Sequence, residues 1–243
     1  MKQFFAYGEE VPGYDVRVLN EREARAAAGI LFALGLISLL NSLMLGATFM
    51  AKSFVAFFTL DFIIRVLKPE YAPSLLLGRF FVRNQTPEYV GAPQKRFAWL
   101  LGLLLALPMF YYVTVHFTPG LDKVIICITC LFLLLFESAF SICFGCMLYG
   151  VLTKKKAQHC PGGVCEIRRK DPIQKFTPVQ AIIAAAAAGA IVFSVSYYVT
   201  QYKDRSVFMP HLRDALMTDA QRQAKEEAEY QKELDAFEAD DDF

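Results

Sequence analysis

The sequence has few of the residues and motifs on which common enzyme classes depend. It contains three histidines, which are too few for a two-haem site held by paired histidine ligands. It has no G-x-x-x-x-G-K-[ST], H-E-x-x-H, G-x-S-x-G or G-x-G-x-x-G pattern. These absences argue against a P-loop nucleotidase, a zinc metalloprotease, an α/β-hydrolase and a dinucleotide-binding enzyme.

A strong charge of one sign is also missing, since the formal net charge is +1. The lysines and arginines gather in loops between apolar segments. Such loops fit membrane orientation and lipid headgroups better than nucleic acid. We therefore expect a lipid bilayer and no nucleic acid among the partners.

Long hydrophobic runs are abundant. Hydrophobic residues make up 55% of the chain, against about 45–50% in soluble domains, and the mean hydropathy is +0.35. The apolar blocks are residues 26–64, 97–117, 124–152 and 178–199. The first block is long enough for two spans of about 20 residues joined by a turn. The sequence thus predicts an all-α polytopic membrane helix bundle of about five transmembrane helices.

Capping patterns support these limits. Asn20-Glu-Arg-Glu23 precedes the first span and Thr177-Pro-Val-Gln180 precedes the last. Both read as capping boxes, in which two side chains satisfy backbone N–H groups at a helix start. A third, Thr218-Asp-Ala-Gln221, predicts a helix in the tail.

Basic residues predict the orientation. The segment up to Arg25 has four, residues 65–96 have six and residues 153–176 have seven, whereas the two short turns have one each. The positive-inside rule then places the N-terminus inside and the C-terminal tail outside. If the cell is bacterial, the membrane is the inner membrane and the tail is periplasmic or extracellular. The only tryptophan, Trp99, is expected at the membrane interface, as in an aromatic belt.

These features divide the chain into five parts. They are a cytoplasmic N-terminal segment (1–25), a four-helix transmembrane domain (26–152), a basic cysteine-containing cytoplasmic loop (153–177), a fifth transmembrane helix (178–200) and an acidic helical tail (201–243). Residues 211–243 carry eleven acidic and four basic side chains. This stretch is interpreted either as a solubilising tail or as a docking helix for a membrane or periplasmic protein.

Three charged residues lie inside apolar segments. Asp61 and Arg65 are four residues apart, so they share a helix face and can pair, either structurally or as part of a site. Glu137 is expected near the middle of the fourth span. Ionisable groups at that depth usually face the bundle interior or a water-filled cavity. Glu137 is therefore either functional or a neutral acid that is hydrogen-bonded to a neighbour such as Asn41 or Ser138.

All six cysteines fall into close pairs, Cys127/Cys130, Cys143/Cys146 and Cys160/Cys165. The spacing of the last two pairs is near that of a four-thiolate zinc site. A C-x-x-C thiol on a helix is also suited to thiol–disulfide or sulfur-transfer chemistry. In the third interpretation the cysteines pack as small apolar residues, and this is the preferred interpretation for Cys127 and Cys130. No cofactor is firmly implied, and zinc is the candidate metal.

An ordered set of short motifs resembles a known family. The set is Asp15-Val-Arg17-Val-Leu-Asn20-Glu21, Asp61-Phe-Ile-Ile-Arg65, Tyr71-Ala-Pro73, Pro93-Gln-Lys95-Arg96-Phe97, Glu137 and Cys143-Phe-Gly-Cys146-x-x-Tyr149. Over about residues 12–152 the chain resembles a bacterial four-span integral-membrane family known as domain of unknown function 4395. The resemblance implies that Asp61, Arg65, Glu137, Cys143 and Cys146 share one site, with Tyr149 in support. It supplies no activity, and the rest of the chain lies beyond it.

Two hypotheses follow, and they leave open whether the protein is an enzyme. In the first, Cys143 or Cys146 is a reactive thiol at the cytoplasmic membrane face, and Glu137 donates or accepts a proton. Asp61 with Arg65 sets the local field, and Cys160 with Cys165 forms an exchanging or metal-binding pair. In the second, the protein is a non-catalytic subunit or assembly factor of a membrane complex, and its cysteines hold zinc or pack. A transporter using Glu137 is a weaker alternative, because no internal repeat is visible.

Overall fold

The computed structural model describes residues 7–46, 48–116, 120–153, 177–202 and 217–241. The helices are α1 (Glu21–Leu45), α2 (Phe49–Leu67), α3 (Pro73–Val82), α4 (Ala92–Met109), α5 (Leu121–Phe140), α6 (Phe144–Thr153), α7 (Pro178–Tyr202) and α9 (Asp219–Asp241). Two short strands, β1 (Val18–Asn20) and β2 (Tyr89–Gly91), precede α1 and α4. A 3₁₀ turn (Pro69–Tyr71) precedes α3, and a π-helical turn (Phe110–Val115) continues α4.

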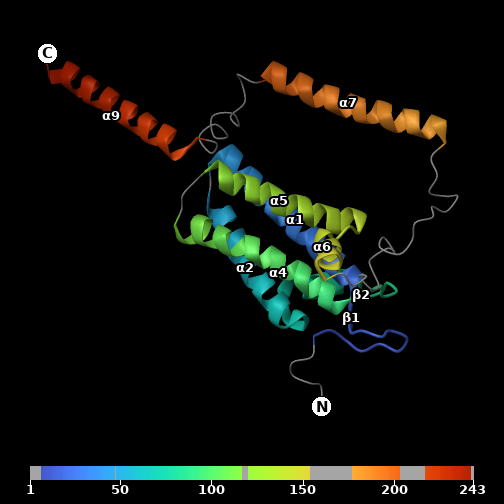
Figure 1. The fold of residues 1–243 in the computed structure, drawn as a ribbon. Coiled ribbons are helices and arrows are strands. Elements are labelled where there is room, and N and C mark those ends of the chain that lie inside the picture. Colours follow the sequence, from blue (N-terminus) through green and yellow to red (C-terminus); the bar gives the residue numbers. More distant parts are fainter. Residues whose placement is uncertain (1–6, 47, 117–119, 154–176, 203–216, 242–243) are drawn as a thin grey trace.

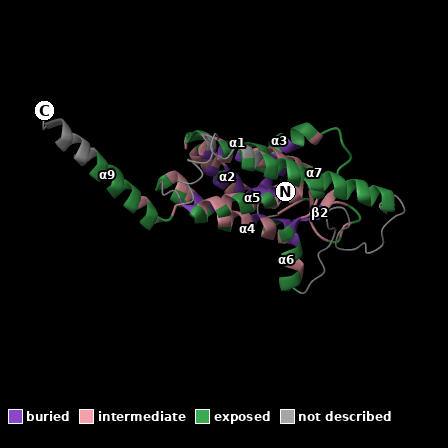
Figure 2. Ribbon diagram, turned by 90° about the horizontal axis from the view of Figure 1, so that it is seen from above, coloured by how far each residue is buried: buried purple, intermediate pink, exposed green. Residues whose placement is uncertain are grey.

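Helices α1, α2, α4 and α5 form a bundle (Figure 1). α1 packs against α2, α3 and α5, while α4 packs against α2 and α6. The core includes Leu31 from α1, Phe58 and Phe62 from α2, and Trp99 from α4. Buried residues are concentrated inside this bundle, and α7 and α9 are exposed (Figure 2). The predicted fold class, an all-α membrane helix bundle, is therefore confirmed.

Four helical segments are long and apolar enough to cross a membrane. They are Glu21–Leu43, Ala92–Val115, Leu121–Phe140 and Pro178–Tyr197. α2 has 19 residues and three charged side chains, Lys52, Asp61 and Arg65, and it packs between α1 and α4. The protein is therefore multi-pass, whereas the count of five spans and the orientation remain predictions.

The expected fourth span over residues 124–152 is divided in two. α5 ends at Phe140, and Ser141 has a left-handed backbone conformation with φ of 58°. The chain resumes as α6, whose 10 residues cover about 15 Å, half of the hydrocarbon thickness. α6 is thus too short to span, and Glu137 lies one turn from the end of α5 instead of in mid-span.

The predicted caps are present. The Asn20 side chain accepts from Arg22 N and begins α1. Thr177 and Gln180 bond reciprocally before α7, as do Thr218 and Gln221 before α9. Each sequence pattern therefore marks a helix start.

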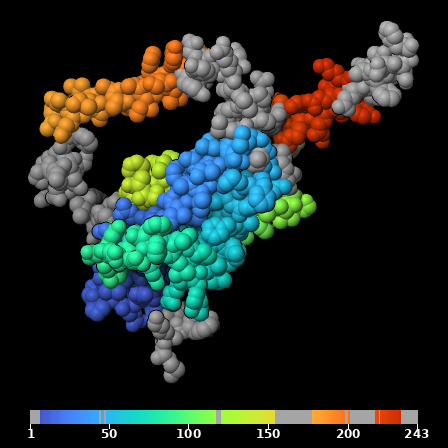
Figure 3. Space-filling model, turned by 180° about the vertical axis from the view of Figure 1, so that it is seen from behind, coloured from blue at the N-terminus to red at the C-terminus, as the bar shows by residue number. Residues whose placement is uncertain are grey.

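Helix α3 packs against α1. Seen from behind, the teal surface of α3 lies beside the blue surface of α1 (Figure 3). A Cβ on Gly78 would lie 2.5 Å from the Glu23 carbonyl oxygen, so this close approach requires glycine. The other face of α3 exposes Leu76, Leu77 and Phe81, as an interfacial helix would.

Candidate functional site

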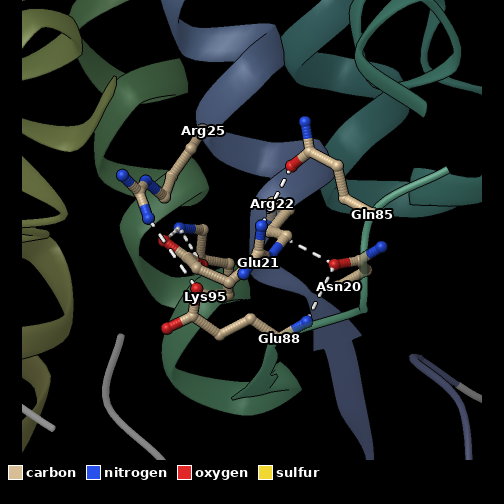
Figure 4. Close-up of polar contacts among 7 residues, drawn as sticks. All are labelled: Asn20, Glu21, Arg22, Arg25, Gln85, Glu88 and Lys95. Carbon is tan, nitrogen blue, oxygen red and sulfur yellow. Dashed lines mark hydrogen bonds and ion pairs between the residues drawn. The ribbon is translucent and has the colours of Figure 1, made fainter. Parts of the chain in front are cut away.

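A small two-stranded sheet brings the starts of two helices together. β1 and β2 pair antiparallel, with Leu19 opposite Val90. α1 and α4 follow these strands directly, so they begin side by side. Glu21 N donates to the carbonyl oxygen of Glu88 at 2.6 Å, which joins the two segments where α1 begins (Figure 4).

The first turns of α1 and α4 form a buried ion cluster with α5. Lys95 Nζ lies 2.7 and 3.0 Å from the two carboxylate oxygens of Glu21, and 2.8 Å from Glu137 Oε1. Lys95 and Glu21 are fully buried, and the Glu137 side chain is 15% exposed. A buried charge is tolerated only when it is paired, and Lys95 satisfies two carboxylates at once. The suggested hydrogen bond from Glu137 to Asn41 or Ser138 is therefore wrong, because Glu137 pairs with Lys95 instead.

Polar contacts enclose this cluster on the side of the strands. Arg25 reaches Glu88 at 3.7 Å, and Arg22 donates to Gln85 at 3.0 Å (Figure 4). Both arginines lie on α1, and both acceptors lie in the segment that leads to β2. These contacts fix the approach of that segment to α1, and so the position of Lys95.

A second buried cluster contains the other predicted pair. Arg65 Nε donates to Asp61 Oδ2 at 2.7 Å, and Asp61 Oδ1 accepts from Ser74 N at 2.9 Å. The Arg65 guanidinium also donates to Ser74 Oγ at 2.6 Å. Tyr7 donates its hydroxyl to the Arg65 carbonyl oxygen at 2.7 Å, and burial raises the pKa of Tyr7 well above its ordinary value. Arg65 therefore pairs with Asp61 and Ser74, and Glu137 pairs with a different cation.

Trp99 lies between the two clusters and is not an aromatic belt residue. It is 2% exposed, so its expected interfacial position was wrong. The Arg65 guanidinium carbon lies 5.4 Å from the centre of the Trp99 ring and 4.9 Å from that of Phe62. The indole N–H of Trp99 has no hydrogen-bond partner within the part of the chain that the structure describes. The single tryptophan thus contributes to the core.

The C-x-x-C pair lies at the start of α6. Cys143 precedes the helix, and its carbonyl oxygen accepts from Met147 N at 3.1 Å, so Cys143 occupies the N-cap position. Cys146 is one turn further on. A Cβ on Gly145 would lie 2.5 Å from Ala98 Cβ, so glycine between the cysteines allows α6 to touch α4. The Phe-Gly of the motif therefore positions both thiols near the first turns of α4.

Tyr149 supports the same packing. Its ring centre lies 5.6 Å from that of Phe97 on α4, in a tilted arrangement. An aromatic pair of this kind adds about 0.5–1.5 kcal/mol to the gain from area burial. Tyr149 thus holds α6 on α4 and has no contact with a reacting group among the described contacts.

The electrostatics of the two thiols differ. A hydrogen bond from the Cys146 side chain lowers the pKa of Cys143, and the Lys95 ammonium adds to the effect. The helix N-terminus also favours a thiolate there. The same hydrogen bond and burial raise the pKa of Cys146. Cys143 is therefore the preferred thiolate, and Cys146 carries the proton between them.

A cavity of about 330 Å³ borders this site. Glu137, Cys143 and Trp99 line it together with apolar side chains of α2, α4, α5 and α6. Its volume is at the lower end of the 300–1,000 Å³ of typical ligand pockets. The candidate site is thus a thiol pair, a carboxylate and an ammonium, of which Cys143 and Glu137 line an apolar cavity.

Residues 19–154 match the model of the family described as domain of unknown function DUF4395. The matched stretch is more than half of the 243-residue chain. The chain belongs to this family. No curated protein and no solved structure matches it. The DUF4395 region contains both ion clusters from Glu21 onward and the C-x-x-C, while α7 and α9 lie beyond it.

Within the DUF4395 region the structure brings together only part of the site implied by the resemblance. Glu137 and the two thiols lie around Lys95, whereas Asp61 and Arg65 form their own cluster. Sequence reasoning missed Glu21 and Lys95 as partners of Glu137, and Ser74 as a partner of Asp61. A signal was available for Lys95, since it follows Pro93 in the first turn of an apolar helix.

The zinc hypothesis gains no support from the described residues, where no group of three or more histidine, cysteine or acidic side chains is placed to hold a metal ion. Cys160 and Cys165, the other half of that hypothesis, lie outside the described residues. Cys127 and Cys130 line an apolar cavity of about 70 Å³ in the bundle, and Cys130 also borders the 330 Å³ cavity. Their packing role remains a prediction.

Proposed function

We propose that this membrane protein carries out thiol–disulfide exchange through Cys143 and Cys146. The observation that carries the proposal is the placement of Cys143 at the N-cap of α6, with the Cys146 thiol hydrogen-bonded to its sulfur and Lys95 nearby. A helix N-terminus, a C-x-x-C partner and a neighbouring cation are three independent features that stabilise a thiolate. The thiolate, and not the thiol, is the nucleophile in exchange.

The reaction has two steps. The Cys143 thiolate attacks one sulfur of a substrate disulfide, so that a mixed disulfide forms and one substrate thiolate leaves. Cys146 then loses its proton and attacks the Cys143 sulfur, which forms the Cys143–Cys146 disulfide and releases the second substrate thiol. Glu137, at the cavity wall, accepts the proton from Cys146. The same steps in reverse oxidise a substrate dithiol.

The remaining residues act on this centre indirectly. Lys95 holds the Glu137 carboxylate and favours the Cys143 thiolate, and Glu21 fixes Lys95. Asp61 and Arg65 position α2 against the start of α3 through Ser74. Their role in the proposal is to hold the wall of the cavity at Phe62, over which Arg65 lies.

The proposal also includes location and partners. The basic loops favour a bacterial inner membrane with the C-x-x-C near the cytoplasmic face. The acidic helix α9 has mostly exposed side chains, and none is buried among those that the structure describes. We assign it to contact with a membrane or periplasmic protein, which loss of co-purification on deletion of residues 211–243 would test.

The central test uses purified full-length protein, reduced and freed of reductant, with the small neutral probe bis(2-hydroxyethyl) disulfide. Peptide mapping by mass spectrometry locates each disulfide. We expect the wild type to form the Cys143–Cys146 disulfide, Cys143→Ser to lose exchange at this pair, and Cys146→Ser to accumulate a mixed disulfide on Cys143. Cys127→Ser, the matched control in the bundle, should behave as wild type. Undiminished exchange in Cys143→Ser would overturn the proposal.

A further inference from the structure

The cavity beside the thiol pair has a lining unlike that of a site for polar substrates. Four aromatic rings border it, from Phe58, Phe62, Trp99 and Phe144. Most of the other lining side chains are leucines. Such a wall favours a flat, apolar molecule that can stack on rings.

The rim of the cavity reaches the outer apolar surface of the bundle. Leu104, Phe144 and Leu148 line the cavity and are also 65%, 38% and 42% exposed. Leu104 lies within a span that is long and apolar enough to cross the membrane. A ligand can therefore enter from the hydrocarbon phase without crossing a polar surface.

The polar groups at the wall define the rest of the ligand. Trp99 lines the cavity, and its indole N–H is a buried donor without an acceptor among the described residues. A buried donor left without an acceptor is unfavourable. Glu137 and Cys143 lie on the same cavity. The site thus offers a proton-transferring carboxylate and a reactive thiol to a ligand with carbonyl oxygens, beside an indole whose N–H lacks an acceptor.

From this juxtaposition we propose that the cavity binds a lipid-soluble quinone that oxidises the Cys143–Cys146 dithiol. This inference rests on the proposed exchange function and names its electron acceptor. A quinone is flat and apolar, dissolves in the bilayer and carries two carbonyl acceptors. The 330 Å³ cavity accommodates the ring and the start of its tail.

The chemistry balances. The S–H bond of Cys146 breaks and one S–S bond forms, so the thiolate–thiol pair loses two electrons and one proton. The second proton that the quinone takes up comes from the aqueous phase, into which Cys143 released its proton when its thiolate formed. Both quinone carbonyl groups gain one electron and one proton each and become hydroxyls. Glu137 takes a proton from the thiol pair and passes it to the nearer quinone oxygen. The resulting disulfide then oxidises a substrate dithiol by the exchange steps above, which regenerates Cys143 and Cys146.

The test adds decylubiquinone, whose fully substituted ring disfavours addition of thiols, to reduced full-length protein in nanodiscs. Quinone absorbance measures quinol formation, and peptide mapping measures the Cys143–Cys146 disulfide. We expect one quinol for each disulfide. Leu104→Trp, which fills the rim of the cavity, should raise the quinone concentration for half-maximal oxidation by about tenfold, equivalent to 1.4 kcal/mol of binding.

Leu100→Trp is the matched control, because Leu100 is also on α4 and 50% exposed but does not line the cavity. It should change that concentration less than twofold. The rate of oxidation by the quinone relative to that by bis(2-hydroxyethyl) disulfide should fall in Leu104→Trp and stay unchanged in Leu100→Trp. Oxidation by that disulfide but not by the quinone, or equal quinone dependence in the two variants, would overturn the quinone site alone. Failure of both oxidants would overturn the proposed exchange function as well.

Discussion

Replacement of Lys95 by methionine tests the buried ion cluster most directly. The substitution keeps the length of the side chain and removes its charge. It leaves the carboxylates of Glu21 and Glu137 without the cation that lies within 3.0 Å of Glu21 and 2.8 Å of Glu137. Breaking a buried ion pair by removing one partner costs about 3–5 kcal/mol. Whole proteins have about 5–15 kcal/mol of stability, so this loss should be large.

The assay is the free energy of unfolding in detergent micelles, obtained by denaturant titration and followed by circular dichroism. Lys123→Met is the matched control, because Lys123 pairs with an Asp122 side chain that is 66% exposed, at 3.2 Å. An exposed pair contributes about 0–1 kcal/mol, so this control should lose little. The Lys95→Met loss should exceed the control loss by at least about 2 kcal/mol.

A compensating variant separates charge from packing. Lys95→Met combined with Glu21→Gln and Glu137→Gln removes the whole cluster, and replacing a complete buried ion cluster by neutral groups is often close to neutral. We expect it to recover a substantial part of the loss. The reasoning is refuted if Lys95→Met is no less stable than Lys123→Met, or if the triple variant is as unstable as the single one.

Two further predictions concern the cluster around Arg65. Asp61→Asn should cost about 3–5 kcal/mol in the same unfolding assay, because it leaves the Arg65 guanidinium buried without its counter-charge; a loss under about 1 kcal/mol would show that the pair is dispensable. Because burial raises the pKa of Tyr7, the folded protein holds that proton above pH 10, where the unfolded chain releases it, so stability should fall as the pH rises past about 10. Tyr7→Phe should weaken that decline, and an unchanged decline would contradict it.

Local patterns accounted for most of what could be predicted. The Asn20, Thr177 and Thr218 caps require contacts between residues at most three positions apart, so the sequence contains the whole motif. The Asp61–Arg65 pair was also predicted, because four residues make one helical turn. Contacts between residues far apart in the sequence have no fixed spacing, so these patterns could not predict them.

The break after α5 shows the limit of these patterns. Ser141 adopts a left-handed conformation without the glycine or proline that usually marks a helix end. Apolar residues continue on both sides, so residues 124–152 were predicted as one span. Gly145 and its contact with Ala98 then direct α6 onto α4, which requires both helices to be in place.

The position of Trp99 and the partner of Glu137 were missed for a related reason. Lys95 and Trp99 lie in a segment whose charges predict a cytoplasmic loop and whose tryptophan predicts an interface. The β1–β2 sheet instead places the start of α4 inside the protein. Strands of three residues are too short to show an alternating pattern, so nothing in the sequence indicated them.

The sequence alone determined that this is a multi-pass helical membrane protein, because apolar length and capping are properties of contiguous residues. It also singled out Glu137 and the Cys143/Cys146 pair, since carboxylates and closely spaced thiols are rare in apolar segments. Only the tertiary structure decided that Lys95 stands between Glu21 and Glu137, and that Cys143 shares a cavity with Glu137. Those contacts join helices far apart in the chain. Lys95 and Glu21 are fully buried, so neither charge has an alternative to the partner that packing supplies.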